Sequence, residues 1–375
     1  MSSWKKFAVI LFVLLFAVSA AACGGPAPAP APDDDDAPEP AEPFVVGFIY
    51  GSPIGDEGWT YVQDLGRKYI EANTDNVETI YVESVPPGAD AERVITQLIE
   101  EQGARMIFAG SSGYVDPVQN MAARYPDVMF VQMQGHVPAD NIWTVLSRDD
   151  QPFYLMGMVA GMMTESDTIG MVAAVPAPQS FFAINAYTLG ARSVNENASV
   201  RVVWTNSWYD PALETDAAKS LIASGADVIA QYVASSAPIL ATVEEGKFAF
   251  GAYVDMSKYD AEKVLSGFLH DWGPLYKSLV DEAIAGTFVG VRDEGKVSNG
   301  VMKLASFSDL VPADVVAAVE AKFDEMYNET WDTNHGPIRT QDGEVMADEG
   351  EVLDKTIWFN HTWYVEGVHG SPPTR

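Results

Sequence analysis

The amino-acid sequence predicts an α/β protein with two similar lobes, each built on a parallel sheet with helices on both faces. Apolar runs rich in β-branched residues alternate along the chain with segments of helical periodicity, which is the pattern of strands joined by crossover helices. The order of strand, turn and helix that begins near residue 45 begins again near residue 200. The part after the N-terminal region, roughly 330 residues, also exceeds the length at which one hydrophobic core keeps growing. We therefore expect two Rossmann-like lobes joined by a hinge.

The predicted elements follow the same order in the two halves. In the first half we expect strand 45–50, helix 60–72, strand 78–83, a helix from residue 90 and strand 106–109. In the second half we expect strand 200–204, a helix that ends at 224 and strand 227–230. The domain prediction assigns 44–147 and 265–292 to the N-terminal lobe, and 148–264 and 293–372 to the C-terminal lobe.

Residues 1–22 are typical of a lipoprotein signal peptide. Lys5 and Lys6 precede an apolar run over 7–18, and small residues precede Cys23. The apolar run is shorter than the ~20 residues that a membrane-spanning helix needs. Cys23 is the only cysteine in the chain, so it has no disulfide partner, and we expect it to carry a lipid. The alternative is ordinary secretion with a free thiol.

Residues 23–43 are rich in proline, alanine and aspartate, a composition that cannot bury a core. We interpret them as a solvated tether between the lipid and the folded part. The sequence thus predicts a protein anchored to the cell membrane on its extracytoplasmic face, in the periplasm or on the outer surface.

The folded part is strongly acidic. The formal net charge is −31, and without Lys5, Lys6 and the six acidic residues of the tether it is −27. Such a charge repels nucleic acids and phosphorylated metabolites, so we expect no nucleic-acid partner and favour a small neutral or cationic ligand. Self-repulsion also favours a monomer.

The motifs of common enzyme classes are missing from the sequence. There is no phosphate-binding loop, no GxGxxG, no GxSxG and no HExxH. The five histidines are dispersed and do not have the spacing of a zinc site. We therefore expect no catalytic residue, no metal and no cofactor.

Ligands of open parallel sheets bind beyond the carboxyl ends of the strands, so two facing lobes place both sets of strand ends along one cleft. The segments predicted to line it are 51–61, 110–116, 133–136, 147–153, 174–185, 205–210, 231–237, 253–257 and 268–273. Their aromatic candidates for ligand stacking are Trp59, Tyr61, Tyr114, Phe181, Trp208, Tyr232, Tyr253 and Trp272. Their polar candidates for hydrogen bonds are Asp56, Ser111, Ser112, Asn185, Asp210 and Asp255. The competing interpretation is that the aromatic residues fill the lobe cores and that the aspartates cap helices and turns.

Six runs of residues together resemble the basic membrane protein family of ABC-transporter substrate-binding lipoproteins, which includes purine nucleoside receptors. They are residues 55–61, 88–95, 184–193, 206–211, 272–274 and 363–367, with the sequences GDEGWTY, GADAERVI, INAYTLGARS, NSWYDP, WGP and WYVEG. The resemblance implies a class I periplasmic-binding-protein fold and a purine base or nucleoside held between aromatic rings. It also implies ABC permease subunits as partners.

Particular positions carry over from the family motif. Trp59 matches the base-stacking position, Asp56 a neighbouring polar contact, and Trp272 a cleft residue. The chain departs from its relatives at Val233–Ala234, at Phe181–Phe182 and at Tyr253, where polar or charged groups are replaced by apolar or aromatic ones. We expect a purine-class ligand in a pocket that is less polar than theirs.

Two alternatives stay open on the sequence alone. The same fold serves ligand-sensing lipoproteins, and it also serves receptors for sugars or other neutral ring compounds. A nucleoside hydrolase would need a cluster of aspartates for a metal or a water, and the folded part of the sequence has none.

Overall fold

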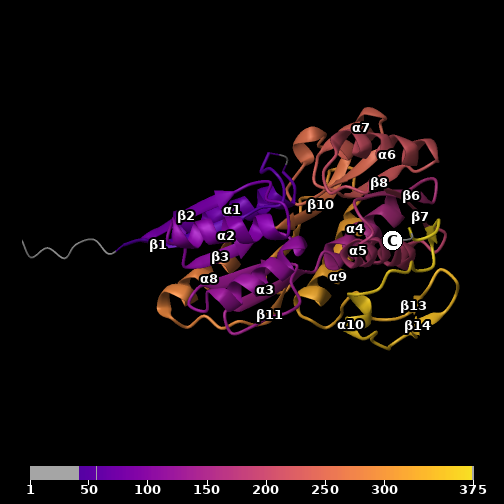
Figure 1. Cartoon of the computed structure of the whole chain (residues 1–375). Coiled ribbons are helices and arrows are strands. Elements are labelled where there is room, and N and C mark those ends of the chain that lie inside the picture. The colour runs from indigo at the N-terminus through magenta and orange to yellow at the C-terminus, as the bar shows by residue number, and fades with distance from the viewer. Residues whose placement is uncertain (1–41, 56, 374–375) are drawn as a thin grey trace, which may run out of the picture. The chain divides into compact units, whose positions relative to one another are not determined.

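Two parallel sheets form where the alternation of apolar runs and helices predicted them. The computed structural model describes residues 42–55 and 57–373 (Figure 1). The predicted signal peptide, Cys23, almost all of the tether and Asp56 lie outside the described residues. Strands such as β3 (Met106–Ala109) and β8 (Val228–Tyr232) are buried along their whole length, because helices cover both faces of each sheet. The predicted α/β class is confirmed.

The first sheet has six strands in the order β11-β5-β4-β3-β1-β2, and all of its neighbouring strands run parallel. The chain up to the first crossover forms β1 (Phe44–Ile49), α1 (Trp59–Asn73), β2 (Val77–Val82), α2 (Ala89–Glu100), β3, the 3-10 helix η2 (Ser112–Tyr114), α3 (Val115–Arg124), β4 (Met129–Met133) and β5 (Ile142–Ser147).

The second sheet has seven strands in the order β12-β10-β9-β8-β6-β7-β15, and only the pairing of β10 with β12 is antiparallel. Its elements before the second crossover are α4 (Asp150–Met163), β6 (Thr168–Ala173), α5 (Pro178–Val194), β7 (Ser199–Trp204), α6 (Pro211–Ala223), β8, α7 (Ala237–Glu244), β9 (Phe248–Gly251), the 3-10 helix η3 (Ser257–Tyr259) and β10 (Val264–His270).

The C-terminal part of the chain returns to the first lobe and then completes the second. In order it forms α8 (Gly273–Ala285), β11 (Arg292–Gly295), β12 (Met302–Leu304), α9 (Ala313–Tyr327), β13 (Ile338–Arg339), β14 (Val345–Ala347), α10 (Lys355–Trp358) and β15 (Val368–His369). Helix α8 packs against α1 of the first lobe, and α9 packs against α4 of the second. Strands β13 and β14 form a small antiparallel hairpin of their own.

The sheet pairings move two of the predicted lobe boundaries. The predicted first-lobe range 265–292 contains β10, but β10 pairs with β9 in the second sheet. The predicted second-lobe range 293–372 begins inside β11, which pairs with β5 in the first sheet. The second crossover between the lobes therefore follows His270, and the third follows Gly295. The residues of a strand do not by themselves specify which sheet it joins, so the sequence could not locate these two crossovers.

A buried arginine joins the crossover segments. Arg148 is almost completely buried, and its guanidinium donates two bonds of 3.0 Å to the carboxylate of Asp150. It also contacts Glu294 of β11 at 3.0 Å and Asp332 at 2.5 Å. Burial by itself raises the pKa of the Asp332 carboxyl, but the neighbouring arginine outweighs this effect and holds that pKa below its ordinary value. The cluster therefore ties the first crossover to β11 and to the segment that contains Asp332.

Candidate functional site

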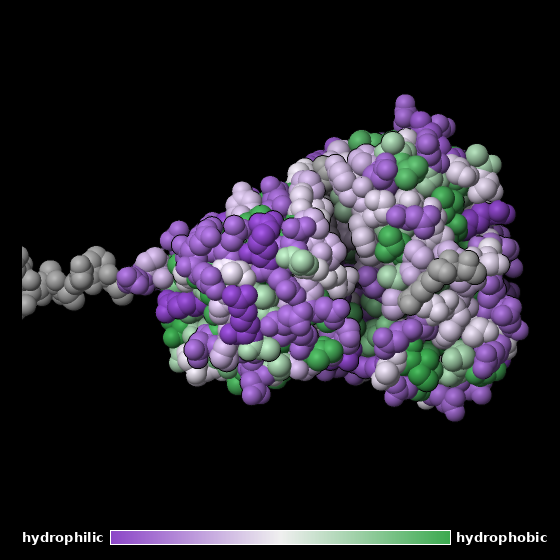
Figure 2. Space-filling model, in the orientation of Figure 1, coloured by the Kyte–Doolittle hydropathy of each residue, from purple (hydrophilic) through white to green (hydrophobic). Residues whose placement is uncertain are grey.

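A cavity of about 140 Å³ lies between the two lobes, in the groove that separates them (Figure 2). We call it the interlobe cavity. Its lining follows the carboxyl ends of strands in both sheets, as expected for parallel α/β lobes. The first lobe contributes Gly51, Ser52, Trp59, Thr60, Gly110, Ser111, Ser112 and Gln134, and the second contributes Gln179, Trp208, Tyr232, Ala234 and Tyr253. All thirteen fall in the segments predicted from the strand ends.

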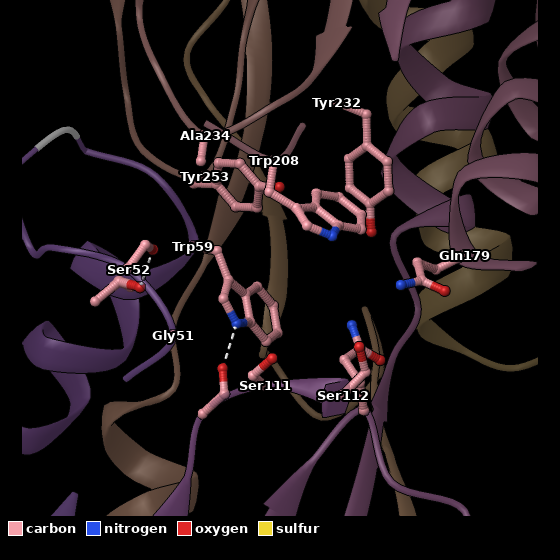
Figure 3. Close-up of a pocket in the computed structure, with 13 residues that line it drawn as sticks. Gly51, Ser52, Trp59, Ser111, Ser112, Gln179, Trp208, Tyr232, Ala234 and Tyr253 are labelled. Atoms are coloured by element: carbon pink, nitrogen blue, oxygen red, sulfur yellow. Dashed lines mark hydrogen bonds between the residues drawn. The ribbon is translucent and has the colours of Figure 1, made fainter. Parts of the chain in front are cut away.

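Trp59, the first residue of α1, projects into the middle of this group of side chains (Figure 3). Its indole N–H donates to the carbonyl of Gly110 at 2.8 Å, which fixes the orientation of the ring. Three rings meet it nearly edge to face, at centroid distances of 6.4 Å for Tyr253, 5.6 Å for His270 and 6.1 Å for Trp272. Trp59 is therefore a rigid flat surface for a ring ligand.

The second lobe supplies the facing aromatic wall. Trp208 and Tyr232 contact each other edge to face at 5.8 Å, and Tyr232 stacks on Tyr253 at 6.4 Å. Burial raises the pKa of the Tyr232 and Tyr253 hydroxyls well above their ordinary value, so both are protonated at neutral pH. The wall therefore presents neutral rings.

The polar groups of the cavity are all uncharged. None of the thirteen described lining residues is acidic or basic. Ser111 Oγ accepts from the backbone N–H of Gly113 at 3.2 Å, so its proton is free to be donated to a ligand. Within the described ranges, the Gln179 side chain has no hydrogen-bond partner, and both ends of its amide can bind a ligand. The arrangement suits a neutral ligand with a flat ring and a few polar edges.

Six of the residues predicted to bind ligand come together at the interlobe cavity: Trp59, Ser111, Ser112, Trp208, Tyr232 and Tyr253. Asp56 lies outside the described residues. The remaining seven, which are Tyr61, Tyr114, Phe181, Asn185, Asp210, Asp255 and Trp272, do not line the cavity.

The aromatic members of this second group have structural contacts instead. The Tyr114 hydroxyl donates to the carbonyl of Val85 at 2.6 Å, and Tyr61 is half-buried against the main core. Phe181 packs against Trp204 and Tyr364, with both centroid distances 5.6 Å. Trp272 is 1% exposed and stacks on Tyr276, so it supports Trp59 from behind rather than facing the cavity.

The polar members stabilise local structure. Asp210 caps α6 by accepting from the N–H of Leu213 at 3.1 Å, and Asp255 accepts from the N–H of Ser257 at 2.9 Å. These are the capping roles that the competing interpretation gave to aspartates at strand ends. Asn185 is fully buried and holds the segment after α10, as described next.

Asn185 and His361 determine each other's hydrogen bonds. Asn185 Oδ1 accepts from the backbone N–H of Val365, so Asn185 Nδ2 donates to His361 Nε2 at 2.6 Å. His361 Nδ1 in turn donates to the carbonyl of Trp358 at 2.5 Å. This arrangement requires a neutral imidazole, and burial lowers the pKa of His361 from 6.5 to about 4.

We expect the protein to lose about 3 kcal/mol of stability through this histidine as the pH falls from 6.5 to 4, because the unfolded chain binds a proton there that the folded state does not. Urea unfolding across this pH range measures the loss. His361→Gln should remove this part of the pH dependence, and substitution of the exposed His369 by Gln should keep it. Equal pH dependence in the two variants would contradict the assignment.

Seven residues of the cavity were not among the predicted ligand contacts: Gly51, Ser52, Thr60, Gly110, Gln134, Gln179 and Ala234. They lie in the predicted segments, so position relative to the strand ends was the available signal. Small and amide side chains occur in many turns, so their type gave no reason to select them.

The turn after β1 reaches across to the second lobe at the edge of the cavity. The Glu57 carboxylate contacts the Lys258 ammonium, and it accepts from the Tyr259 hydroxyl at 3.0 Å. A hydrogen bond to Glu57 raises the pKa of Lys258, so the ammonium is charged at neutral pH. Beside it, Gly58 lies against the backbone of Ala234. These contacts join the two lobes in this structure.

We expect Glu57→Gln to weaken ligand binding by a factor of about 1.4 to 5, because an exposed ion pair contributes roughly 0.2–1 kcal/mol. Isothermal titration calorimetry at low and high salt measures the effect, which should shrink as salt screens the pair. Asp281→Asn is the matched control, because Asp281 pairs with Lys277 within a single helix, α8. A loss of equal size in both variants would show that the Glu57 contact does not act on closure.

Two parallel-sheet lobes that enclose a ring-lined cavity at their strand ends define a two-lobed, class I periplasmic-type binding protein. Solved ABC-transporter solute-binding proteins share the fold. One from Aeropyrum pernix has a TM-score of 0.68 and 16% identity, covering 80% of this chain and 93% of its own. One from Conexibacter woesei has a TM-score of 0.65 and 22% identity, covering 77% of this chain and 98% of its own.

Sequence comparison gives the family. Residues 44–334 match the family described as ABC transporter substrate-binding protein PnrA-like. A purine-binding protein of Brucella abortus is 37% identical over 333 residues, which cover 88% of this chain and 95% of that protein. A protein of Haloferax volcanii named as an ABC transporter glucose-binding protein is 34% identical over 337 residues, which cover 90% of this chain and 83% of that protein.

The chain therefore belongs to the PnrA-like family of ABC transporter substrate-binding proteins. This is the family that the sequence motifs resembled. Its members bind small molecules outside the cytoplasm for an ABC permease, and they are binding proteins rather than enzymes. In the part of the chain that the structure describes, no helix is both long and apolar enough to cross a membrane.

Proposed function

We propose that this protein captures a purine nucleobase or nucleoside in the interlobe cavity and delivers it to an ABC importer. The observation that carries the proposal is the position of Trp59, a fixed indole that faces the aromatic wall of the other lobe across an uncharged cavity. A purine is a neutral flat ring with polar edges, so it can stack on Trp59 while its edges meet serine hydroxyls and glutamine amides.

The size of the cavity and the net charge of the protein agree with a purine base. A cavity of about 140 Å³ is close to the roughly 150 Å³ of an engineered protein cavity that binds benzene, so one small ring system fits between the lobes as they stand, and the sugar of a nucleoside would require more space. The formal net charge of −31 disfavours phosphorylated nucleotides. The purine-binding relative from Brucella abortus supports the same class.

Titration calorimetry of the purified protein with adenine, guanine, hypoxanthine, their nucleosides and glucose tests the proposal. We expect purines to bind and glucose to give no heat, with a thermal midpoint that rises in parallel. Glucose is included because the relative from Haloferax volcanii is named for it. Binding of glucose and of no purine would leave the transport role intact and refute the ligand class.

We also propose that Cys23 carries the lipid that holds the receptor at the membrane. A cysteine that follows small residues and an apolar run supports this role. In cells of the source organism, labelled fatty acid should enter the wild-type protein but not Cys23→Ser, and the variant should appear in the medium or periplasm. An unlabelled wild type would refute the anchor without affecting the binding site.

A further inference from the structure

Beneath the interlobe cavity lies a buried carboxylate that does not itself line it. Asp149 is fully buried in the crossover between β5 and α4. Its Oδ2 accepts from the Tyr232 hydroxyl at 2.6 Å and from Ser147 Oγ at 2.7 Å. Its Oδ1 lies 2.6 Å from His270 Nε2. One carboxylate therefore contacts three side chains, Ser147 at the end of β5 in the first sheet, and Tyr232 and His270 from strands of the second sheet.

These contacts continue to the wall of the cavity. Ser147 Oγ accepts from Gln134 Nε2 at 2.6 Å, and the Ser147 backbone N–H donates to Gln134 Oε1 at 3.2 Å, so both ends of this cavity amide are oriented. The ring of His270 packs against Trp59. Three cavity residues, Tyr232, Gln134 and Trp59, are thus held directly or through one neighbour by Asp149.

The charge of Asp149 determines the direction of each hydrogen bond. Burial by itself raises the pKa of this carboxyl, but His270 and the hydroxyls of Tyr232 and Ser147 outweigh it, and the pKa lies below its ordinary value. An ionised carboxylate only accepts hydrogen bonds. The Tyr232 and Ser147 hydroxyls must therefore both donate to it, and His270 Nε2 must carry a proton.

The consequence for the cavity concerns Tyr232. Its hydroxyl end points into the space between Trp208 and Gln179 (Figure 3). Because its only proton is donated to Asp149, the oxygen offers a ligand lone pairs alone. A ligand atom that meets this oxygen must be a hydrogen-bond donor.

We infer that Asp149 is a positioning residue that makes the Tyr232 hydroxyl an obligatory acceptor, so that the cavity selects ring compounds with an N–H or amino group at that point. The inference rests on the proposed function in taking a ring ligand in the cavity, and it specifies which edge chemistry that ligand presents. A ring with only acceptors on that edge places two lone-pair atoms against each other and binds more weakly.

The first test measures selectivity with adenine, 9-methyladenine and purine, because the second compound lacks the ring N–H at position 9 and the third lacks the amino group. Adenine should bind about tenfold more tightly than the compound that lacks the donor facing Tyr232, which is 9-methyladenine if the ring N–H faces it and purine if the amino group does. A tenfold change in Kd corresponds to about 1.4 kcal/mol. Tyr232→Phe should remove that preference. Tyr114→Phe is the matched control, because it also removes a buried hydroxyl that donates a hydrogen bond of 2.6 Å, but outside the cavity.

Asp149→Leu separates positioning from packing. Leucine has a similar size but no hydrogen-bond acceptor, so the Tyr232 proton is released and the preference for adenine should disappear or reverse. A structural role would weaken all three compounds by the same factor. Equal weakening, or a preference that persists in Tyr232→Phe, would overturn the inference.

A second test needs no ligand. In the proton NMR spectrum of the unliganded wild type we expect exchange-protected downfield signals from the Tyr232 hydroxyl and from His270 Nε2–H, since both bonds are to a buried carboxylate. Tyr232→Phe should remove the first signal, and Asp149→Leu, which offers no acceptor, should remove both. If the wild type binds no purine, the proposed function fails, and this spectrum then decides the inference. Absence of both signals from the wild type would overturn it.

Discussion

Replacing Trp59 with alanine is expected to weaken purine binding about a hundredfold or more. Stacking of a base on an aromatic ring contributes roughly 1–3 kcal/mol, and the emptied space costs further contact energy. Each 1.4 kcal/mol corresponds to about a tenfold change in Kd. The side chain is held by its bond to Gly110 and by three surrounding rings, so no neighbour is free to take its place.

Titration calorimetry against adenine measures this loss, and Trp59→Phe is the matched variant. Phenylalanine keeps a flat face but loses the bond to Gly110, so we expect binding between those of the wild type and the alanine variant. Unfolding of the unliganded proteins by urea shows whether the fold is retained. An alanine variant with wild-type affinity would exclude Trp59 as the stacking surface.

The second large effect is expected from Gly58→Ala, which should weaken ligand binding by at least about tenfold. A Cβ at Gly58 would lie 2.4 Å from the carbonyl oxygen and 2.8 Å from the Cβ of Ala234 in the opposite lobe. These are backbone and near-backbone atoms that cannot rotate away, so the clash is relieved only by separation of the lobes. An opened cavity loses the second aromatic wall.

Gly55→Ala provides the control in the same turn. A Cβ at Gly55 meets no atom within 4 Å, so affinity should stay at the wild-type value. Small-angle scattering with saturating adenine should show a compact wild type and Gly55→Ala, and a more open Gly58→Ala. The unliganded Gly58→Ala protein should melt near the wild-type temperature, because neither lobe core is altered. Wild-type affinity in Gly58→Ala would mean that the lobes do not close as this structure has them.

Prediction from the sequence succeeded where it depended on local pattern. Alternating apolar runs and helical periodicity located β1, β2 and β3 of the first sheet and β7 and β8 of the second. The rule that ligands lie beyond the carboxyl ends of parallel strands selected every segment that lines the cavity. Asp210, before Pro211, was recognised as a possible cap because that role is local, and it is one.

The roles of individual side chains were harder to predict, because they depend on which residues from other parts of the chain face them in the fold. Trp59 and Trp272 occur in similar turns after strands, yet Trp59 faces the cavity and Trp272 stacks on Tyr276 behind it. Gln134 and Gln179 line the cavity without any feature that distinguishes them in the sequence. No local pattern distinguishes Asp149, because its partners Tyr232 and His270 lie far along the chain.

The sequence by itself determined that this protein is built from two parallel-sheet lobes, that the segments lining the interlobe cavity follow the strand ends, and that its charge disfavours anionic ligands. These properties depend on periodicity and composition, which are local or summed quantities. Only the tertiary structure decided that β10 joins the second sheet, which aromatic rings face the cavity, and that a buried carboxylate orients Tyr232. Those outcomes depend on contacts between distant residues, and packing in three dimensions selects them among local alternatives that are nearly equal in energy.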